Sequence, residues 1–379
     1  MRVYQISKPK DIKEFLKNLE VDSGGISIIA KKMELIFIKI EELKTPAINI
    51  LKQDALSIGA EVAVPSGVIL CKKEYYDCLL IGTKRQLEFL AKKLKAQPFG
   101  LKSVASKIEE FLYPKSFPIK IMGVLNINSD SFYSGSRFSQ KDAVKKIEQM
   151  VSKGADIIDI GAVSSRPGSK AVSENEELNR IKELLNTIKE QKLYELATFS
   201  IDSYTPQVIE YALNCGFSLI NDITGAKDDR VIKLAKRYNS KLCIMHMQGT
   251  PQTMQLNPTY KCVTTEVDEF FAKQIAKCEK IGLSKERIIL DVGIGFGKSL
   301  EHNIELLKNH HHFTHFGCEL LIGASRKSMI DKIYPSSTQD RLPGTLTIHL
   351  KALERGASIV RCHDVAEHKQ AIAIWENIV

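Results

Sequence analysis

The sequence predicts an α/β fold: a (β/α)8 TIM barrel preceded by a small α/β extension. Three observations point to it. From about residue 118 the 379-residue chain repeats a short apolar run followed by an amphipathic stretch, it does so eight times, and nearly every run ends in polar or small residues. Eight such units in about 260 residues match the size of a (β/α)8 barrel.

The apolar runs are continuous rather than alternating, as expected of strands that are buried on both faces. They occupy residues 119–127, 156–163, 197–202, 217–224, 242–247, 287–293, 320–325 and 358–364. Several of the amphipathic stretches between them, such as "PQVIEYALNCG", end in glycine, which is a helix stop signal. A doubly wound open sheet is the alternative, but it needs a glycine fingerprint after its first strand, and "MGVLNINSDSF" has none.

The first 114 residues are expected to form a separate domain, 1–114, before the barrel domain, 115–379. Strands are predicted at 25–32, 33–40, 61–73 and 76–82, and helices at 45–59 and 83–97. The segment "FLYPKSFP" (111–118) reads as a linker because its two prolines stop regular structure. A packing or oligomer-contact role and a regulatory role both fit this extension.

Composition excludes several classes of protein. The chain is 44% hydrophobic and 26% charged, and no apolar run approaches the roughly 18 residues that a membrane span needs. Its start, "MRVYQISKPKDIKEFL", is too charged for a secretory signal, so a cytoplasmic protein without a membrane partner is expected. Eight cysteines without any C-x-x-C pair suggest free thiols.

The net charge of +9 favours an anionic small-molecule substrate over nucleic acid. Residues 1–115 hold 20 basic and 14 acidic side chains, so 20 − 14 = +6 lies there and +3 in the rest. No stripe of Lys and Arg interleaved with aromatic residues appears. The run "NHHHFTHFG" (His310, His311, His312 and His315) invites a metal hypothesis, but a solvated connection between a helix and a strand is expected.

The loop "LDVGIGFGKS" resembles a phosphate-binding P-loop without being one. Gly297, Lys298 and Ser299 fit G-x-x-x-x-G-K-[ST], but Val292 stands where the first glycine is required. Asp291 ends the preceding strand, so the loop is interpreted as a tight turn beside a carboxylate at the mouth of the barrel.

Polar residues end the predicted strands, and the carboxyl ends of barrel strands meet on the face that carries the chemistry. "SSRPG" follows the second strand, and "SRKS" follows the seventh. The strand-end residues are Asn126, Asp202, Asn221, His246, Asp291, Arg361 and His363.

Two chemistries are expected at this face. Cationic and hydroxyl groups suggest a phosphate or pyrophosphate site, with surface salt bridges as the alternative; they are Arg166, Ser325, Arg326, Lys327, Arg361 and His363. Asp202, Asn221 and Asp291, with Met245 nearby, suit a heterocycle that has several N–H and carbonyl groups. The carboxylates could instead be a general acid and base or metal ligands.

Eight motifs in order resemble dihydropteroate synthase, in the pterin-binding barrel superfamily. They are "IMGVLNINSDSF", "IDIGAVSSRPGS", "SIDSYTP", "LINDITG", "IMHMQGTPQTMQ", "IILDVGIGFGKSLEHN", "IGASRKSMI" and "RLPGTLTIHLKALERGASIVRCHDVAE", and the resemblance runs from about Ile119 to Ala371. It implies condensation of 6-hydroxymethyl-7,8-dihydropterin pyrophosphate with para-aminobenzoate, releasing pyrophosphate. It also implies Mg²⁺, a homodimer and a pocket where sulfonamides compete.

The resemblance implies roles residue by residue. The pterin would be held by Asp202, Asn221, Met245, Asp291, Gly323, Lys327 and Arg361. Pyrophosphate would be held by Asn126, Ser165, Arg166, Arg361 and His363, with Asn126 also on the metal. Para-aminobenzoate would be framed by Phe132, Pro167, Phe296, Ser325 and Lys327. Catalysis would depend on Asp202, Asn221, Asp291, Lys327, Arg361 and His363.

The chain departs from the family pattern mainly in two loops. Ser129 and Ser134 replace a proline and an aspartate in the first loop, where Asp130 is kept. Val163 and Ser165 replace a glutamate and a threonine in the second, and Val292 replaces the proline of D-P-G. Methyl transfer from a methylated folate to a corrinoid protein and non-catalytic pterin binding are the competing functions. The first needs no pyrophosphate site, and the second is suggested only by the altered first loop.

Overall fold

The computed structural model describes residues 11–127, 137–163, 172–250 and 252–378. They form two compact units, 11–114 and 115–378, and each has its own hydrophobic core. The described part contains no helix long and apolar enough to span a bilayer.

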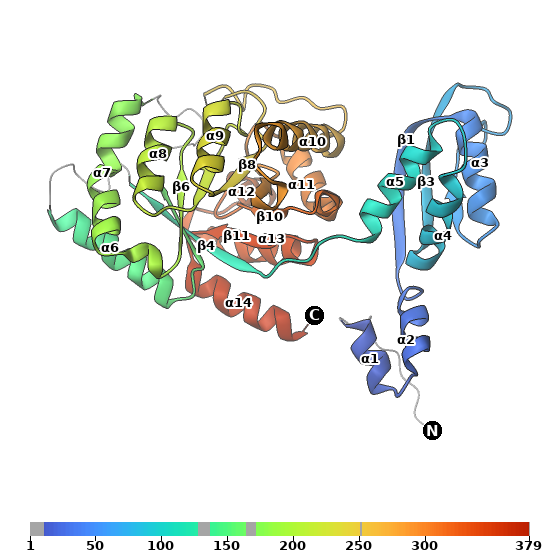
Figure 1. Cartoon of the computed structure of the whole chain (residues 1–379), viewed down its shortest axis with the longest axis horizontal. Helices are drawn as coiled ribbons and strands as arrows, with labels where there is room; N and C mark the ends of the chain where they lie inside the picture. Colours follow the sequence, from blue (N-terminus) through green and yellow to red (C-terminus); the bar gives the residue numbers. More distant parts are fainter. Residues whose placement is uncertain (1–10, 128–136, 164–171, 251, 379) are drawn as a thin grey trace. The chain divides into compact units, whose positions relative to one another are not determined.

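Within the described residues, the second unit is a closed barrel of eight parallel strands, confirming the predicted fold (Figure 1). The strands are β4 (Lys120–Asn126), β5 (Ile157–Gly161), β6 (Thr198–Asp202), β7 (Leu219–Asp222), β8 (Lys241–Met245), β9 (Ile288–Asp291), β10 (Glu319–Ile322) and β11 (Ile359–Cys362). The last strand pairs with the first, with Ile359 opposite Lys120, so the ring has no open edge. All eight predicted strands are present.

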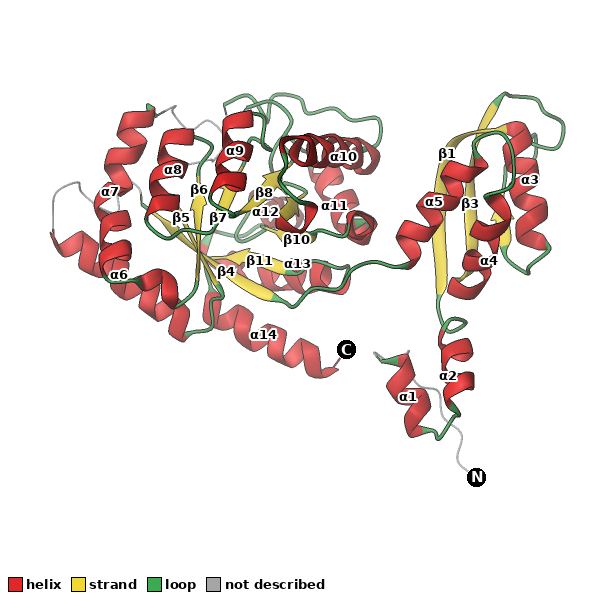
Figure 2. Ribbon diagram, in the orientation of Figure 1, coloured by secondary structure: helices red, strands yellow, loops and turns green. Residues whose placement is uncertain are grey.

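Helices surround this barrel, as Figure 2 shows. They are α6 (Arg137–Ser152), α7 (Glu174–Glu190), α8 (Pro206–Asn214), α9 (Asp229–Arg237), α10 (Val263–Ile281), α11 (Leu300–Lys308), α12 (Ser328–Ile333), α13 (Leu342–Glu354) and α14 (Val365–Ile378). Short 3₁₀ turns occupy η1 (Leu193–Glu195), η2 (Lys285–Arg287), η3 (His310–Phe316) and η4 (Gln339–Arg341).

Apolar side chains fill both sides of the strands, which explains the continuous runs in the sequence. Residues such as Leu125, Ile160 and Ile201 pack outward against the helices. Met122, Leu219 and others fill the inside. At the amino-terminal end of β10, the nearly buried Glu319 accepts hydrogen bonds from Lys120 and Lys241, which begin β4 and β8. One carboxylate therefore ties three strands together at the end opposite the strand carboxyl termini.

The first unit has a three-stranded antiparallel sheet in the order β1-β3-β2. Its elements are α1 (Ile12–Asn18), α2 (Ser23–Ala30), β1 (Leu35–Lys44), α3 (Thr45–Leu56), β2 (Glu61–Ala63), β3 (Tyr75–Thr83), α4 (Lys84–Leu94) and α5 (Leu101–Leu112). The core joins the sheet to α3, α4 and α5.

Two predictions for this unit were wrong. Residues 25–32 were predicted as a strand, but most of them lie in helix α2, whose first turn is capped when Asp22 accepts a hydrogen bond from the Gly25 amide at 2.8 Å. Only residues 61–63 of the predicted strand 61–73 are extended, because Pro65 and the turn that follows it stop the pairing.

The solvated connection predicted for the histidine run is only partly right: His311 is exposed and His312 is partly exposed, but the rest of the segment is not solvated. His310, Phe313, His315 and Phe316 of η3 are buried. Phe313 and Phe316 stack edge-on against Phe271 of α10, with ring centroids 5.7 and 6.1 Å away. Because these phenylalanines pack in the core, the neighbouring His310 and His315 are buried as well. All eight cysteines lie in the described part, and each is a free thiol.

Candidate active site at the carboxyl ends of the barrel strands

The strand ends bring a charged cluster together around Arg361 of β11. Its Nε donates to Asp159 Oδ2 and its Nη2 donates to Asp202 Oδ2, both at 2.6 Å. Asn221 Nδ2 donates to the same Asp159 oxygen at 3.1 Å. Strands β5, β6, β7 and β11 therefore converge on one guanidinium group.

Burial and charge oppose each other in this cluster. Burial raises the pKa of Asp202 to about 7, and the positive charge of Arg361 limits the rise. The two carboxylates hold the pKa of Arg361 above its usual range despite burial. Asp159 is fully buried, and its Oδ1 has no hydrogen-bond partner among the described residues. An unpaired buried carboxylate oxygen is costly, so it can gain from a ligand or water that donates to it.

Asp291 forms a second anionic point at the end of β9. Its Oδ1 accepts the Gly293 amide at 2.8 Å. A methyl group placed on Gly323 would lie 3.8 Å from Arg361 Cβ and 3.9 Å from Asp291 Oδ2, so it would fit in ordinary contact with both side chains and would fill the space that the glycine leaves between them. Burial raises the pKa of Asp291, and Lys327 is the main group that opposes this rise.

Lys327 lies between this carboxylate and an aromatic ring. Its Nζ donates to the Ile294 carbonyl and stands 4.4 Å from the centre of the Phe296 ring, a cation–π distance. Burial lowers the pKa of Lys327 to about 8, although Asp291 opposes the shift. Phe296 in turn packs on a buried apolar cluster made of Ile223, Met245, Met247 and Met254.

Lys298, the apparent P-loop lysine, points into the protein rather than into the mouth. Its Nζ contacts the His246 ring at Nδ1 (2.9 Å) and the carbonyls of His246, Gly293 and Phe296 (3.1, 3.1 and 3.0 Å). Burial lowers its pKa to about 7, whereas three carbonyl acceptors match the three N–H groups of the ammonium ion. Lys298 thus fastens the loop after β9 to the end of β8.

The glycines of this loop are there because backbone passes close by. Gly293 has φ +68°, and a Cβ on it would lie 2.0 Å from the His246 carbonyl oxygen. Gly297 has φ +62°, and a Cβ there would lie 2.5 Å from the Gln248 carbonyl oxygen. The glycine-rich sequence therefore packs one loop on another and does not wrap a nucleotide.

Ser325 and His363 form a polar pair after β10 and β11. Ser325 Oγ lies 2.9 Å from His363 Nδ1, and the His363 amide donates to the same oxygen at 3.3 Å. Arg326, expected among the phosphate ligands, instead forms a bidentate pair with Asp364 (2.6 and 3.0 Å). It serves to hold the two loops together, as in the salt-bridge alternative.

Two buried histidines, His349 of α13 and His368 of α14, connect the loops that follow β10 and β11. The Ala324 amide donates to His349 Nε2 (3.0 Å), His349 Nδ1 lies 2.9 Å from His368 Nε2, and His368 Nδ1 lies 2.6 Å from the Asp364 carbonyl. Because the chain starts at an N–H group and ends at a carbonyl, each ring must accept at Nε2 and donate at Nδ1. Burial lowers the pKa of both histidines, consistent with two neutral rings.

Of the remaining predicted residues, Asn126 and His246 lie in the described part of the chain and the others do not. Asn126 is exposed at the end of β4, and His246 follows β8 as a buried ring whose pKa burial lowers to about 2. Phe132, Ser165, Arg166 and Pro167 lie outside the described residues, as do Ser129, Asp130 and Ser134.

Sequence reasoning missed Asp159, His349 and His368. Asp159 had a signal, since a carboxylate inside the apolar run "DIIDIGAV" needs a buried partner. The histidines had none, because a lone histidine on each of two helices is ordinary.

A closed parallel barrel with charged groups gathered at its strand carboxyl ends defines the class of (β/α)8-barrel enzymes. A family model described as "Pterin binding enzyme" matches residues 122–363. The chain belongs to this family of pterin-binding enzymes.

Similar proteins match two thirds or more of the chain. A bifunctional dihydropteroate synthase/dihydropteroate reductase of Helicobacter pylori is 44% identical over 341 residues, which cover 90% of this chain and 89% of that protein. The dihydropteroate synthase of Escherichia coli K12 is 41% identical over 257 residues, covering 68% and 90%. A Yersinia pestis dihydropteroate synthase structure, solved with a sulfonamide drug complex, has TM-score 0.64 and 36% identity and covers 69% of this chain and 94% of that one.

Proposed function

We propose that this chain is a dihydropteroate synthase, joining 6-hydroxymethyl-7,8-dihydropterin pyrophosphate to para-aminobenzoate with release of pyrophosphate. The observation that carries the proposal is the convergence of Asp159, Asp202, Asn221, Asp291 and Arg361 on one mouth. That set offers anionic acceptors for the N–H groups of a pterin and a cation beside them. It stands in a chain that belongs to the pterin-binding enzymes.

The pterin ring would lie in the space beside Gly323. Asp291 Oδ2 borders that space and would accept hydrogen bonds from the N–H edge of the ring. Asn221 can donate to and accept from the ring, and Lys327 would donate to a ring carbonyl or nitrogen. Met245 and Arg361 would pack on its faces.

The leaving group would sit on the side of Ser325 and His363. The Ser325 hydroxyl and the His363 imidazole, with the His363 amide bonded to the same hydroxyl oxygen, form a compact pair of groups for phosphate oxygens. They would stabilise negative charge that grows on pyrophosphate as the carbon–oxygen bond breaks. Ser165 and Arg166 are proposed to add to this set.

The weak nucleophilicity of an aryl amine favours a path in which pyrophosphate leaves first. Buried carboxylates at Asp202 and Asp291 would stabilise the positive charge that the conjugated pterin then carries. The para-aminobenzoate would be framed by Phe132, Pro167, Phe296, Ser325 and Lys327. No enzyme nucleophile is needed, and the amine proton can leave to solvent after the new carbon–nitrogen bond has formed.

Magnesium is proposed as the metal, with Asn126 as its protein ligand. The Asn126 side chain is exposed at the end of β4 and offers one amide oxygen, which fits an ion that keeps several waters and binds substrate phosphates. When bound, the ion would neutralise charge on the pyrophosphate. A cytoplasmic homodimer likewise remains a proposal, based on resemblance.

Pyrophosphate release tests the synthase directly. Purified protein is mixed with the pterin pyrophosphate, para-aminobenzoate and Mg²⁺, and each component is omitted in turn. Release that requires both substrates, and that Arg361→Met abolishes, is the expected result. Tight pterin binding by calorimetry without any release would overturn the synthase and favour a pterin-binding protein. Demethylation of a methylated folate by a corrinoid acceptor would favour the methyltransferase.

A second candidate activity is the reduction of dihydropteroate. The Helicobacter pylori relative named for both activities covers 90% of this chain, so its similarity reaches into the first unit, whereas the Escherichia coli synthase covers 68%. Reduction would add a hydride and a proton to a C=N bond of the product, with a reduced flavin or reduced nicotinamide as donor. Dihydropteroate-dependent oxidation of either donor supports it, and oxidation of neither overturns it. Supplying dihydropteroate to the Arg361→Met variant separates this step from synthesis.

A further inference from the structure

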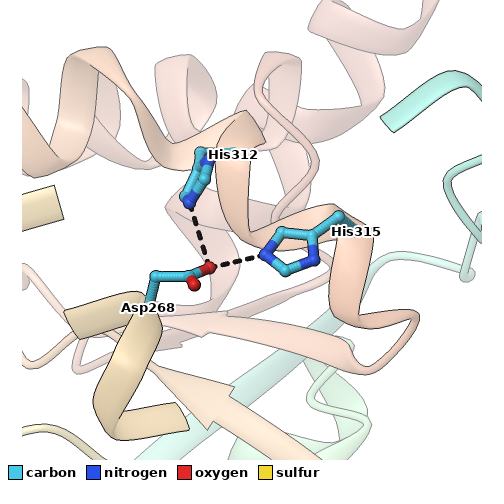
Figure 3. Close-up of side chains that lie close together, drawn as sticks. All are labelled: Asp268, His312 and His315. Atoms are coloured by element: carbon cyan, nitrogen blue, oxygen red, sulfur yellow. Dashed lines mark hydrogen bonds and ion pairs between the residues drawn. The ribbon is translucent and has the colours of Figure 1, made fainter. Parts of the chain in front are cut away.

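Asp268, His312 and His315 form a compact side-chain cluster away from the mouth. Asp268 belongs to α10, and both histidines belong to η3, the buried segment that precedes β10. Figure 3 shows both imidazole rings turned toward one oxygen of the carboxylate. His312 Nε2 lies 3.0 Å and His315 Nε2 lies 2.5 Å from Asp268 Oδ1.

We propose that these three side chains bind a divalent transition metal ion, with Zn²⁺ as the best fit. Two imidazole nitrogens and one carboxylate oxygen are a common zinc donor set, and an open fourth position would take water. One potential donor atom from each residue lies within 4.8 Å of the other two. The site is independent of the proposed synthase and its Mg²⁺.

The geometry is close to that of a metal site. Zinc bonds of about 2.0–2.2 Å in a tetrahedron put neighbouring donor atoms about 3.3 Å apart. The observed separations of 3.0 and 2.5 Å therefore need to widen by about 0.3 and 0.8 Å.

The two rings are held in place by aromatic packing. The His312 ring lies 5.2 Å from Phe313, and the His315 ring lies 4.0 Å from Phe316, measured between ring centroids. Phe313 and Phe316 are themselves buried against α10. The donors are thus held before an ion arrives, which reduces the entropy cost of binding.

Charge and access also suit a cation. With neutral rings the cluster carries one negative charge. The His312 and Asp268 side chains keep 25% and 22% of their surface exposed, whereas His315 keeps 2%. An ion can therefore enter from the His312 side and reach a buried ligand.

Binding exchanges hydrogen bonds for metal bonds. In the empty site each Nε2–H donates to Asp268. On binding, each Nε2 loses this proton so that its lone pair can go to the ion: a neutral ring moves its single proton to Nδ1 by exchange with water, and an imidazolium ring keeps the Nδ1 proton and releases the other to solvent. The ion would link α10 to the segment before β10 and stabilise the folded barrel.

The test is a Co²⁺ and Zn²⁺ titration of the full chain after treatment with a chelator. One equivalent of Co²⁺ should give the absorption of a low-coordinate site, and Zn²⁺ should displace it. Excess Zn²⁺ should raise the unfolding temperature of the barrel by about 5 °C. Mg²⁺ should do neither, because nitrogen donors do not suit it.

Two variants and a matched control decide the assignment. His312→Gln and Asp268→Asn should each weaken binding by at least about 30-fold, because loss of a hydrogen-bonding partner of a ligand alone costs about 10–100-fold and here a ligand itself is lost. His311→Gln, the exposed neighbour in the same histidine run, should bind like the wild type. Absence of stoichiometric binding, or equal binding by His312→Gln, would overturn the proposal. Equal weakening by His311→Gln would assign the binding to the histidine run itself. Synthase activity should be unchanged in Asp268→Asn, because that residue is not part of the mouth.

Discussion

Replacing Lys298 by methionine isolates what its ammonium group does, because methionine keeps an apolar stem of similar length. The change removes the donor that three buried carbonyl oxygens share, those of His246, Gly293 and Phe296. The Gly293 carbonyl keeps the Phe296 amide as a donor at 3.0 Å, but the carbonyls of His246 and Phe296 and the His246 ring nitrogen Nδ1 each lose the Lys298 ammonium. A polar group left without its partner costs about 1 kcal/mol at the lower end of measured values, so these three groups cost roughly 3 kcal/mol. The charge that no longer has to be buried offsets part of this, and a net loss of about 2–3 kcal/mol is expected.

Urea unfolding followed by tryptophan fluorescence measures this loss in the barrel alone. The chain has one tryptophan, Trp375, and it packs on the barrel core from α14. With a slope of about 3 kcal/mol per molar urea, the midpoint should fall by roughly 0.7–1 M. Lys233→Met, at an exposed position of α9, is the control and should change little. A Lys298→Met midpoint within about 0.2 M of the wild type would refute the view that Lys298 fastens the two loops together.

Three further predictions concern the mouth. Burial raises the pKa of Asp202 to about 7, so the folded protein keeps a proton that the unfolded chain loses near pH 4. The free energy of unfolding should therefore fall as the pH rises from about 4 to 7. Urea midpoints measured across that range should show this slope in the wild type and a flatter one in Asp202→Asn. Gly323→Ala should leave the unfolding midpoint unchanged but weaken pterin binding at least about tenfold in calorimetry, since its methyl group fills the space beside Asp291. Gly293→Ala, by contrast, should destabilise the fold. A pterin affinity in Gly323→Ala equal to that of the wild type would show that the pterin does not bind beside this glycine. His349→Leu breaks the hydrogen-bond chain to His368 and should raise the KM for the pterin pyrophosphate about tenfold more than His349→Gln does. An equal KM in the two variants would mean that these histidines contribute only to packing.

The barrel could be predicted because its signal is both local and repeated. A strand buried on two faces has to be apolar throughout, and that leaves a run which can be recognised without its neighbours. The first unit gave weaker signals. In "GISIIAKK" the apolar residues suggest a strand, but Asp22 caps a helix whose side chains are all at least partly exposed. Helix α5 was missed although its buried residues Leu101, Ala105, Ile108 and Leu112 have helical spacing.

Sequence reasoning can predict which residues gather at the strand ends, but not which of them form ion pairs with one another. Asp202, Asn221 and Asp291 are strand-end residues, and topology alone brings such ends together. That Arg361 binds Asp159 and Asp202, whereas Arg326 binds Asp364, depends on side-chain geometry that no spacing encodes. Lys298 shows the same limit, since a motif typical of phosphate binding holds a lysine that faces inward.

Arg361 reaches its carboxylate partners across 202 and 159 residues of sequence. As the chain leaves the ribosome, β5 and β6 emerge long before β11. Asp159 and Asp202 therefore have no ion pair with Arg361 until β11 has been made. A partly synthesised barrel would enclose two carboxylates without a cation, and that repulsion discourages premature collapse. When β11 inserts beside β4, closure of the sheet and neutralisation of the charge occur in one step. A chain that ends before β11 therefore lacks the cation that pairs with Asp159 and Asp202.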